Sequence, residues 1–240
     1  MLPTAILAGG LGTRLRPMTA AIPKALADIN GEPFVAHQLR LLRAHQIDRV
    51  VLCVGYLGEM IRDAIGDGTR FGLHVEYVFD GPIPLETAGA IKKALPLLGE
   101  AFFVLYGDSY LPCDYEAVRR AFAQSGKPAL MTVFRNQGQW DRSNVEFENG
   151  RIIAYEKDNP TPRMRHIDYG LGAFQSSAFA SMPVGEPHDL AALYRDLLRR
   201  GELAGFEVSQ RFYEVGSFEG LRETANFIAR QGVERQQWPT

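Results

Sequence analysis

The sequence predicts an α/β protein with a doubly wound, mostly parallel sheet flanked by helices. Two observations predict it. In the first half, short apolar runs that suit buried parallel strands alternate with amphipathic helical segments. In the second half, two strand patterns flank Asn149-Gly150, a typical hairpin turn, so that the sheet is expected to be mixed. We expect the 240 residues to form a single domain, whose halves divide near residue 115 within one continuous sheet.

The first half is expected to alternate strands and helices. A proline in the first turn and apolar residues at positions 34, 35, 39, 41 and 42 predict a helix over 33–45. The other helices are expected over 58–65 and 86–98. Apolar runs predict strands over 5–8, 50–54 and 102–105, and a weak alternation of apolar and polar residues predicts one over 73–79.

The second half adds strands to the same sheet. They are expected over 129–134, 144–148, 151–156, 166–174 and 212–215. Helices are expected over 190–200 and 218–229. The polar tail 231–240 is expected to fray.

Composition excludes several classes of protein. Apolar residues make up 46% and charged residues 22%, which argues against disorder. The formal charge is −2 and no Lys/Arg block exceeds two residues, so we expect no nucleic-acid partner. There is no leader-like segment or membrane-spanning apolar run, and we expect no membrane association. Cys53 and Cys113 lack metal-type spacing, which favours free thiols in a reducing cytoplasm.

Three glycines follow the first apolar run within four residues, at positions 9, 10 and 12. Glycine permits positive φ and has no Cβ, so that backbone N–H groups can close around an anion. A hydroxyl and three cations come soon afterwards: Thr13, Arg14, Arg16 and Lys24. This combination predicts a loop that binds a polyphosphate.

Two common phosphate-binding loops do not fit this stretch. A P-loop needs a Lys-Ser or Lys-Thr pair after its glycines, and none follows here. A dinucleotide fingerprint needs a third glycine, where this chain has Leu15, and an acidic residue after the second strand, where it has Gly55-Tyr56. A simple glycine turn between a strand and the next segment remains the alternative.

The stretch Gly9-Gly-x-Gly-Thr-Arg-Leu-x-Pro17, with Pro23-Lys24 behind it, resembles the loop of the sugar-1-phosphate nucleotidyltransferases. The resemblance covers roughly residues 3–228 and implies a GT-A-like fold. It also implies that the loop wraps an NTP, that Arg14 contacts its phosphates and that Lys24 lies at the reacting phosphoryl group. The expected nucleotide-binding residues of this first segment are Leu7, Ala8, Gly9, Gly10, Gly12, Thr13 and Arg14.

Two carboxylates are candidate ligands for Mg²⁺. Asp108 follows a predicted strand and Gly107, at the sheet edge where α/β proteins bind ligands. The family has Asn-Gly-Asp here, and this chain has Tyr106-Gly107-Asp108; an N-cap for the helix beginning near Asp114 is the alternative role for Asp108. Glu214 stands where the family has Asp, so its alternative is a solvated strand residue.

The segment Glu86-Thr87-Ala88-Gly89 resembles the family's loop against the base and ribose. By that resemblance Gly89 lets the backbone approach the nucleotide closely. Without it, Thr87 is a plausible N-cap. The segment points to a nucleotide but does not indicate which base.

The acceptor end is expected from the second half. Glu156-Lys157 resembles a family pair in which Glu accepts hydrogen bonds from sugar hydroxyls and Lys contacts the sugar phosphate. An exposed ion pair at a strand end is the alternative. Asp168 and Gly170 fall where the family has Ile-Asn-x-Gly, and an ionised Asp cannot donate as Asn does. Gly107 completes the predicted acceptor residues.

No nucleophile constellation emerges, which agrees with nucleotidyl transfer by positioning and electrostatics. The resemblance implies an enzyme that converts an NTP and a sugar 1-phosphate into an NDP-sugar and pyrophosphate. Within the family, the chain resembles the short bacterial enzymes that activate heptose or N-acetylmuramate phosphates. We favour a heptose 1-phosphate and GTP as the substrates. A cytidylyltransferase for a non-sugar phosphate and a non-catalytic nucleotide-sugar sensor are the alternatives. The sequence does not indicate which base and which sugar the enzyme uses, or whether it forms a homo-oligomer.

Overall fold

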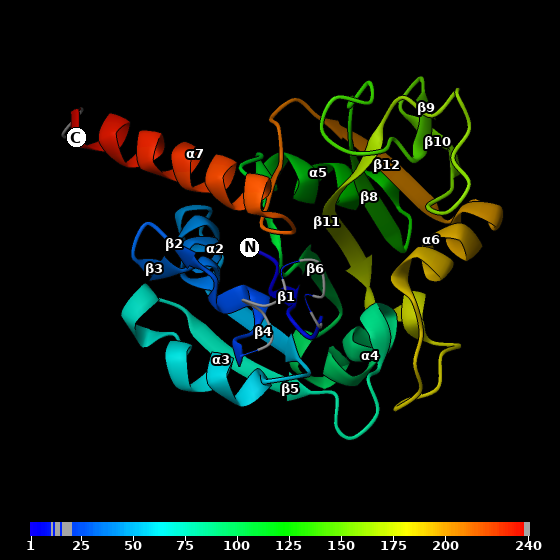
Figure 1. Ribbon diagram of the computed structural model, residues 1–240. Coiled ribbons are helices and arrows are strands. Elements are labelled where there is room, and N and C mark those ends of the chain that lie inside the picture. Colours follow the sequence, from blue (N-terminus) through cyan, green and yellow to red (C-terminus); the bar gives the residue numbers. More distant parts are fainter. Residues whose placement is uncertain (11, 13–14, 16–20, 238–240) are drawn as a thin grey trace.

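The computed structural model describes residues 1–10, 12, 15 and 21–237, with side chains through residue 231. Its centre is a seven-stranded sheet in the order β12-β8-β11-β6-β1-β4-β5 (Figure 1). These strands are β1 (Thr4–Leu7), β4 (Arg49–Val54), β5 (His74–Phe79), β6 (Ala101–Tyr106), β8 (Ala129–Phe134), β11 (Ile167–Gln175) and β12 (Leu203–Val208). The pairs β1–β4, β1–β6, β4–β5 and β8–β12 are parallel, and β11 runs antiparallel to both of its neighbours. The expected fold class is therefore confirmed.

Helices cover both faces of the sheet. The described helices are α2 (Phe34–Ala44), α3 (Gly58–Ile65), α4 (Glu86–Leu98), α5 (Tyr115–Ser125), α6 (Leu190–Arg199) and α7 (Phe218–Gln237). One core cluster joins α2, α3 and α5 to one face, through residues such as Leu39, Ile61 and Val118. The other joins α4 and α6 to the opposite face, for example through Ile91 and Leu197. Burial on both faces explains why the central strands are apolar runs rather than alternating patterns.

Short strands and 3-10 turns complete the chain. The described ones are η2 (Lys24–Leu26), β2 (Asp28–Ile29), β3 (Glu32–Pro33), η3 (Thr69–Phe71), β7 (Ser109–Tyr110), β9 (Val145–Glu148), β10 (Arg151–Tyr155), η4 (Ser176–Phe179) and β13 (Tyr213–Glu214). β9 and β10 form the expected hairpin, and positive φ at Asn149 and Gly150 matches its turn. The hairpin is a separate two-stranded sheet, not part of the main one.

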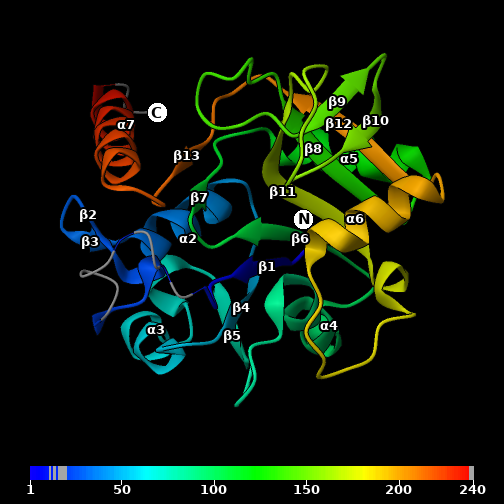
Figure 2. The ribbon, with the colours of Figure 1, turned by 45° about the vertical axis from the view of Figure 1, so that its right-hand side comes forward.

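Two details differ from the sequence expectations. α7 continues through Gln237 and projects from the body of the molecule (Figures 1 and 2), although the tail from 231 was expected to fray. Five of residues 231–237 are Gln, Glu or Arg, which are good helix formers, and no proline comes before Gln237, so the helix continues despite Gly232. β12 was not expected, because Gly205 breaks its strand pattern. A Cβ at Gly205 would lie 2.7 Å from the Phe147 ring, so packing against the hairpin requires glycine there.

Candidate active site

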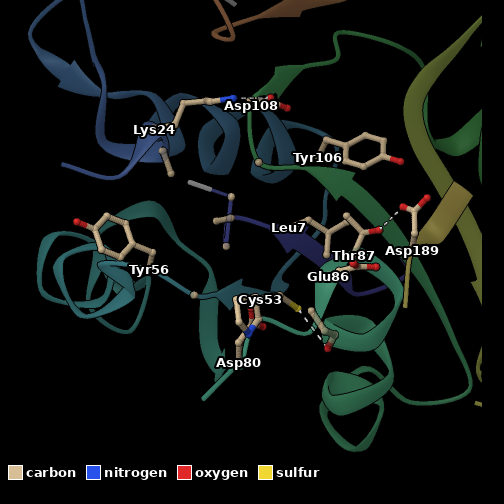
Figure 3. A pocket seen from close by; sticks show the side chains of 18 of the residues that line it. Leu7, Lys24, Cys53, Tyr56, Asp80, Glu86, Thr87, Tyr106, Asp108 and Asp189 are labelled. Carbon is tan, nitrogen blue, oxygen red and sulfur yellow. Dashed lines mark hydrogen bonds and ion pairs between the residues drawn. The ribbon is translucent and has the colours of Figure 1, made fainter. Parts of the chain in front are cut away.

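A cleft of about 880 Å³ lies at the carboxyl ends of four parallel strands (Figure 3). Its lining includes Leu7 from β1, Cys53 from β4, and Asp80 and Asp108, which follow β5 and β6. Carboxyl ends of parallel strands meet at one edge, which is where open α/β sheets bind ligands. The cleft also takes residues from the second half, on α6 and after the hairpin, so both halves of the chain contribute to it.

The glycine loop forms one wall of the cleft. It is lined by four of the predicted nucleotide-binding residues, Leu7, Ala8, Gly9 and Gly10. Gly9 packs on the neighbouring strand, because a Cβ there would lie 3.2 Å from the backbone nitrogen of Gly55. Gly10 is different: a Cβ added to it would meet no atom of the described residues within 4 Å, and it lines the cleft. This is the geometry that close approach of a ligand to backbone requires.

Of the later part of the glycine loop, the described residues include Gly12 and Leu15. Gly12 adopts positive φ (59°), a conformation that glycine tolerates. Its carbonyl accepts a hydrogen bond from the Leu15 amide at 3.0 Å. Thr13 and Arg14 lie outside the described residues, so their predicted contacts with the phosphates stay predictions.

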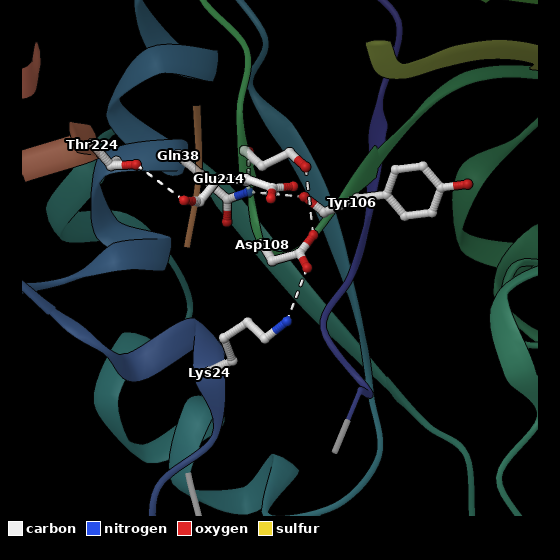
Figure 4. A network of polar contacts seen from close by, with 7 residues as sticks. Lys24, Gln38, Tyr106, Asp108, Glu214 and Thr224 are labelled. Carbon is white, nitrogen blue, oxygen red and sulfur yellow. Dashed lines mark hydrogen bonds and ion pairs between the residues drawn. The ribbon is translucent and has the colours of Figure 1, made fainter. Parts of the chain in front are cut away.

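Lys24 and Asp108 form an ion pair on the cleft wall. The ammonium donates to Oδ2 of Asp108 at 2.9 Å, and the two side chains are 15% and 29% exposed (Figure 4). Lys24 begins η2, whereas Asp108 follows β6, 84 residues later. The pair brings together two residues that the sequence singled out separately. Because both line the cleft, a bound phosphate or cation would contact one partner and replace the other.

The chain around Asp108 is fixed by backbone contacts on two sides. The Gly107 amide donates to the Leu7 carbonyl at 3.0 Å, and a Cβ on Gly107 would come within 2.4 Å of that oxygen. Glycine at 107 is thus required by packing on β1. The N-cap role is excluded for Asp108, because Asp114 caps α5 through a 2.9 Å bond from the Ala117 amide.

Glu214 lies on the strand that pairs with β7. β13 runs antiparallel to β7, with Glu214 opposite Ser109, and the Val215 amide donates to the Asp108 carbonyl at 2.8 Å. Glu214 does not line the cleft itself. Within the described chain, no cluster of three or more His, Cys, Asp or Glu side chains is placed to hold a metal ion. Backbone bonds therefore join the segments that carry Asp108 and Glu214, but among the described residues their carboxylates belong to no closed protein cage.

The segment 86–89 is held against α6. Glu86 and Thr87 line the cleft, and Glu86 has positive φ (58°), which is unusual for a residue with a Cβ. The Thr87 hydroxyl donates to Asp189 at 3.1 Å and accepts from the Leu190 amide at 2.7 Å. Thr87 thereby caps the start of α6 rather than that of its own helix.

Ala88 and Gly89 are bound to the segment before α6. Their amides donate to the His188 carbonyl at 2.8 and 3.1 Å, and neither residue lines the cavity. A Cβ on Gly89 would lie 2.4 Å from the Glu186 carbonyl oxygen. The passing 186–188 segment therefore accounts for this glycine.

Lys157 lines the cleft, whereas its neighbour Glu156 does not. The Oε1 atom of Glu156 accepts from the Asp158 amide at 3.2 Å and lies 3.7 Å from the Arg195 guanidinium. Glu156 thus holds the loop and a helix α6 cation in place. Arg195, Asp158 and Asp189 line the cleft beside Lys157.

Asp168 and Gly170 lie behind Tyr106. Oδ1 of Asp168 accepts from the Gly170 amide at 3.0 Å, and the Tyr155 hydroxyl lies 3.5 Å from Oδ2. Burial raises the pKa of Asp168 to about 6, although the Gly170 amide and Lys157 oppose the shift. Gly170 has positive φ (97°), and a Cβ there would lie 3.3 Å from the Tyr106 ring, which lines the cleft. Asp168 and Gly170 therefore support the cleft wall and do not line it.

Comparison with known proteins agrees with this geometry. The family profile described as "Nucleotidyl transferase" matches residues 4–231. The chain belongs to the nucleotidyl transferase family. An N-acetylmuramate alpha-1-phosphate uridylyltransferase from Neisseria meningitidis serogroup B is 29% identical over 224 residues, covering 91% of this chain and 94% of that protein.

Two further proteins match this chain over different shares of their own length. A mannose-1-phosphate guanyltransferase from Gibberella zeae is 37% identical over 218 residues, covering 88% of this chain and 60% of the relative. The crystal structure of HddC from Yersinia pseudotuberculosis complexed with GMP-PN superposes with a TM-score of 0.79 at 22% identity. It covers 95% of this chain and all of the other, and it supports the fold.

The sequence alone did not identify several residues that line the cleft of this nucleotidyl transferase. Asp80 follows β5 directly, so the rule that identified Asp108 would also have found it. Its Oδ2 accepts from the Leu85 amide at 3.3 Å, and burial raises its pKa. Asp189 and Arg195 carry no local signal, because α6 brings them in from a distant segment.

None of the described helices has the length and apolar character needed to span a bilayer.

Proposed function

We propose that this chain transfers a nucleotidyl group from an NTP to a sugar 1-phosphate and releases pyrophosphate. The observation that carries the proposal is the Lys24–Asp108 pair on the wall of a cleft that the glycine loop shares with the acceptor end. The cleft volume, about 880 Å³, suits a ligand of this size. Residues up to about 115 would bind the nucleotide and residues from about 116 to 230 the acceptor.

The bond changes follow from the positions of these groups. An oxygen of the sugar phosphate forms a bond to the α-phosphorus, and the bond from that phosphorus to the β-phosphate oxygen breaks. No protein nucleophile or general base is required, because the attacking oxygen is already anionic. The protein must instead hold the two anions in line and stabilise the charge on the reacting phosphates.

Each end of the cleft supplies part of that positioning. The open backbone at Gly10 would face the triphosphate, with Arg14 and Lys24 neutralising its charge. Lys157 is the exposed cation at the acceptor end and would contact the sugar phosphate. Arg195 is engaged with Glu156, and we assign it to the wall around the sugar.

The carboxylates fit Mg²⁺ as the metal. Mg²⁺ binds proteins through one or two carboxylates and completes its shell with substrate phosphates and water, so an open pair suits it better than a closed cage. Asp108 and Glu214, on segments joined by backbone hydrogen bonds, would hold it, and when bound it would neutralise charge on the phosphates. The two buried free cysteines agree with a reducing cytoplasm as the working compartment.

The proposal is tested by a matrix of NTPs against sugar 1-phosphates with Mg²⁺, read by pyrophosphate release. GTP with a heptose 1-phosphate is the first pair to test, and UTP with N-acetylmuramate 1-phosphate the second. We expect at least one pair to release pyrophosphate and form the matching NDP-sugar. Turnover only with a non-sugar phosphate and CTP, or tight nucleotide binding with no release from any pair, would contradict the proposal.

A further inference from the structure

A polar side chain lies where helix α2 should be apolar. Gln38 follows Phe34, which packs with Val215 and α7, by four residues in the helix, and it is 1% exposed. Its Nε2 atom donates to the Tyr106 carbonyl at 3.1 Å and to the Ser109 carbonyl at 2.8 Å. Two acceptors at these distances fix the orientation of the amide, because the opposite orientation would place oxygen against oxygen.

The two acceptors flank Asp108. Tyr106 ends β6 and Ser109 begins β7, so one buried amide joins both ends of the turn that carries Gly107 and Asp108 (Figure 4). Backbone bonds also tie the turn to β1, through the Gly107 amide, and to β13, through the Val215 amide that donates to the Asp108 carbonyl. Gln38 ties its outer side to α2.

The same amide also affects the second carboxylate. Ser109, whose carbonyl Gln38 binds, is the residue paired with Glu214 across β7 and β13. Thr224, which is fully buried on α7, donates to the Glu214 carbonyl at 3.4 Å from the other side. Displacement of Ser109 would therefore move both Asp108 and the strand that carries Glu214.

We infer that Gln38 is a positioning residue for the reaction, which holds Asp108 and Glu214 at the spacing that a shared cation requires. This inference rests on the proposed function. Mg²⁺ tolerates little deviation from octahedral geometry, so a small movement of either carboxylate weakens its site. A buried side chain that only filled space at this helix position would be a leucine or methionine. The two hydrogen bonds of Gln38 serve the turn instead.

The test replaces Gln38 by an isosteric apolar residue. Gln38→Met keeps the volume and removes both donors. We expect kcat to fall by about 10-fold or more and the Mg²⁺ concentration for half-maximal activity to rise several-fold. The KM for NTP should stay within about 2-fold, because the hydrogen bonds of Gln38 go to Tyr106 and Ser109 and not to the described residues of the glycine loop. Affinity for Mn²⁺, measured by calorimetry with a non-hydrolysable NTP and no acceptor, should fall in parallel without any turnover.

Tyr77→Phe is the matched control. It also removes a side-chain hydrogen bond to a backbone carbonyl, that of Gly66 at 2.6 Å, but on the edge strand β5 and outside the cleft. It should leave kcat and metal affinity unchanged. If Gln38→Met proves unstable, Gln38→Asn keeps the amide but shortens its reach, and it should show the same shifts to a smaller extent.

The outcomes separate this inference from the proposed function. A Gln38→Met or Gln38→Asn enzyme with wild-type kcat and wild-type Mn²⁺ affinity would show that Gln38 is structural only and would overturn the inference. A wild-type protein that binds Mn²⁺ with NTP but turns over no acceptor would overturn the proposed function, while the binding measurement would still test Gln38.

Discussion

At the nucleotide end of the cleft the ligand would face mainly backbone, whereas at the acceptor end it would face side chains from distant segments. The nucleotide end is built from strand ends and the glycine loop, and Gly10 leaves its backbone open. At the acceptor end, Lys157 follows the hairpin, and Arg195 and Asp189 come from α6 and its N-cap. The first arrangement would bind any triphosphate, and the second can change with the acceptor.

This difference predicts that substitutions at the two ends change different kinetic constants. Changes at the nucleotide end should lower kcat, since its charged groups act on the reacting phosphates in the transition state. Changes at the acceptor end should raise the KM for the sugar phosphate and leave that for NTP unchanged.

The largest effect is expected for Asp108→Asn. The amide keeps the shape but removes the charge that Mg²⁺ needs, so turnover should fall by about 1000-fold or more, and excess Mg²⁺ should restore little of it. Pyrophosphate release measures the loss. Asp114→Asn is the control, because Asn also caps helices and α5 should be unaffected. A variant of Asp108 that works in the presence of chelator would remove the metal role.

Lys24→Ala and Arg14→Ala should each lower kcat by about 100-fold. Both cations would stabilise charge on the reacting phosphates, and Lys24 also pairs with Asp108. Circular dichroism should show an intact fold. Lys127→Ala is the control, since this ammonium binds the Leu203 carbonyl at 3.0 Å, away from the cleft. Near-normal turnover in both cleft variants would contradict the proposed nucleotide end.

Substitutions of Glu214 test whether this residue is a ligand of Mg²⁺ between the two ends of the cleft. If it helps to hold Mg²⁺, Glu214→Gln should lower turnover by about 10-fold to 100-fold and keep NTP binding, because the charge is lost. Glu214→Asp keeps the charge and should be less impaired, with water filling the gap. Steady-state kinetics with Mg²⁺ titration compares the two. Full activity in the Gln variant would show that Glu214 is not a ligand.

Lys157→Ala should raise the KM for the sugar 1-phosphate by roughly 10-fold, since one charge-assisted hydrogen bond to the phosphate is lost. The KM for NTP should not change, which is the feature that separates the two ends. Initial rates at varied concentrations of each substrate give both constants. An equal rise in both would contradict the division of the cleft.

The smallest effect is expected in stability at the acceptor end. Burial raises the pKa of Asp168 to about 6, so the folded protein binds its proton more tightly than the unfolded chain does. This contribution to stability is complete below pH 4 and is lost as the pH rises through about 6. The melting temperature of Asp168→Asn, relative to wild type, should therefore be higher at pH 7 than at pH 4. A difference independent of pH would show that Asp168 does not titrate in this range.

The contrast between the two ends also explains what could be predicted from the sequence. The bounds of Gly58–Ile65, Glu86–Leu98 and Ala129–Phe134 match the prediction, because each has a clear apolar period and nearby turn residues. The strand Leu203–Val208 was not predicted, because Gly205 interrupts its apolar pattern. That glycine is required by the hairpin that packs on it. Tertiary contacts of this kind leave little trace in the local pattern.

The candidate site follows the same rule. The glycine loop and Asp108 could be predicted because each follows its strand directly in the chain. Arg195 could not, since its place at the cleft depends on how α6 packs and on its ion pair with Glu156. Gln38 is visible in the sequence as a polar residue on an apolar helix face. Its role could not be predicted, because it depends on the carbonyls to which the side chain is hydrogen-bonded.

The central claim is that a phosphate oxygen of the acceptor attacks the α-phosphorus within this cleft. The most direct measurement supplies sugar 1-phosphate labelled with heavy oxygen in its phosphate group, and locates the label in the products by mass spectrometry. The account predicts that all of the label is in the NDP-sugar and that the pyrophosphate carries none. Unlabelled nucleoside monophosphate with unchanged sugar phosphate would show attack by water, and would contradict the account.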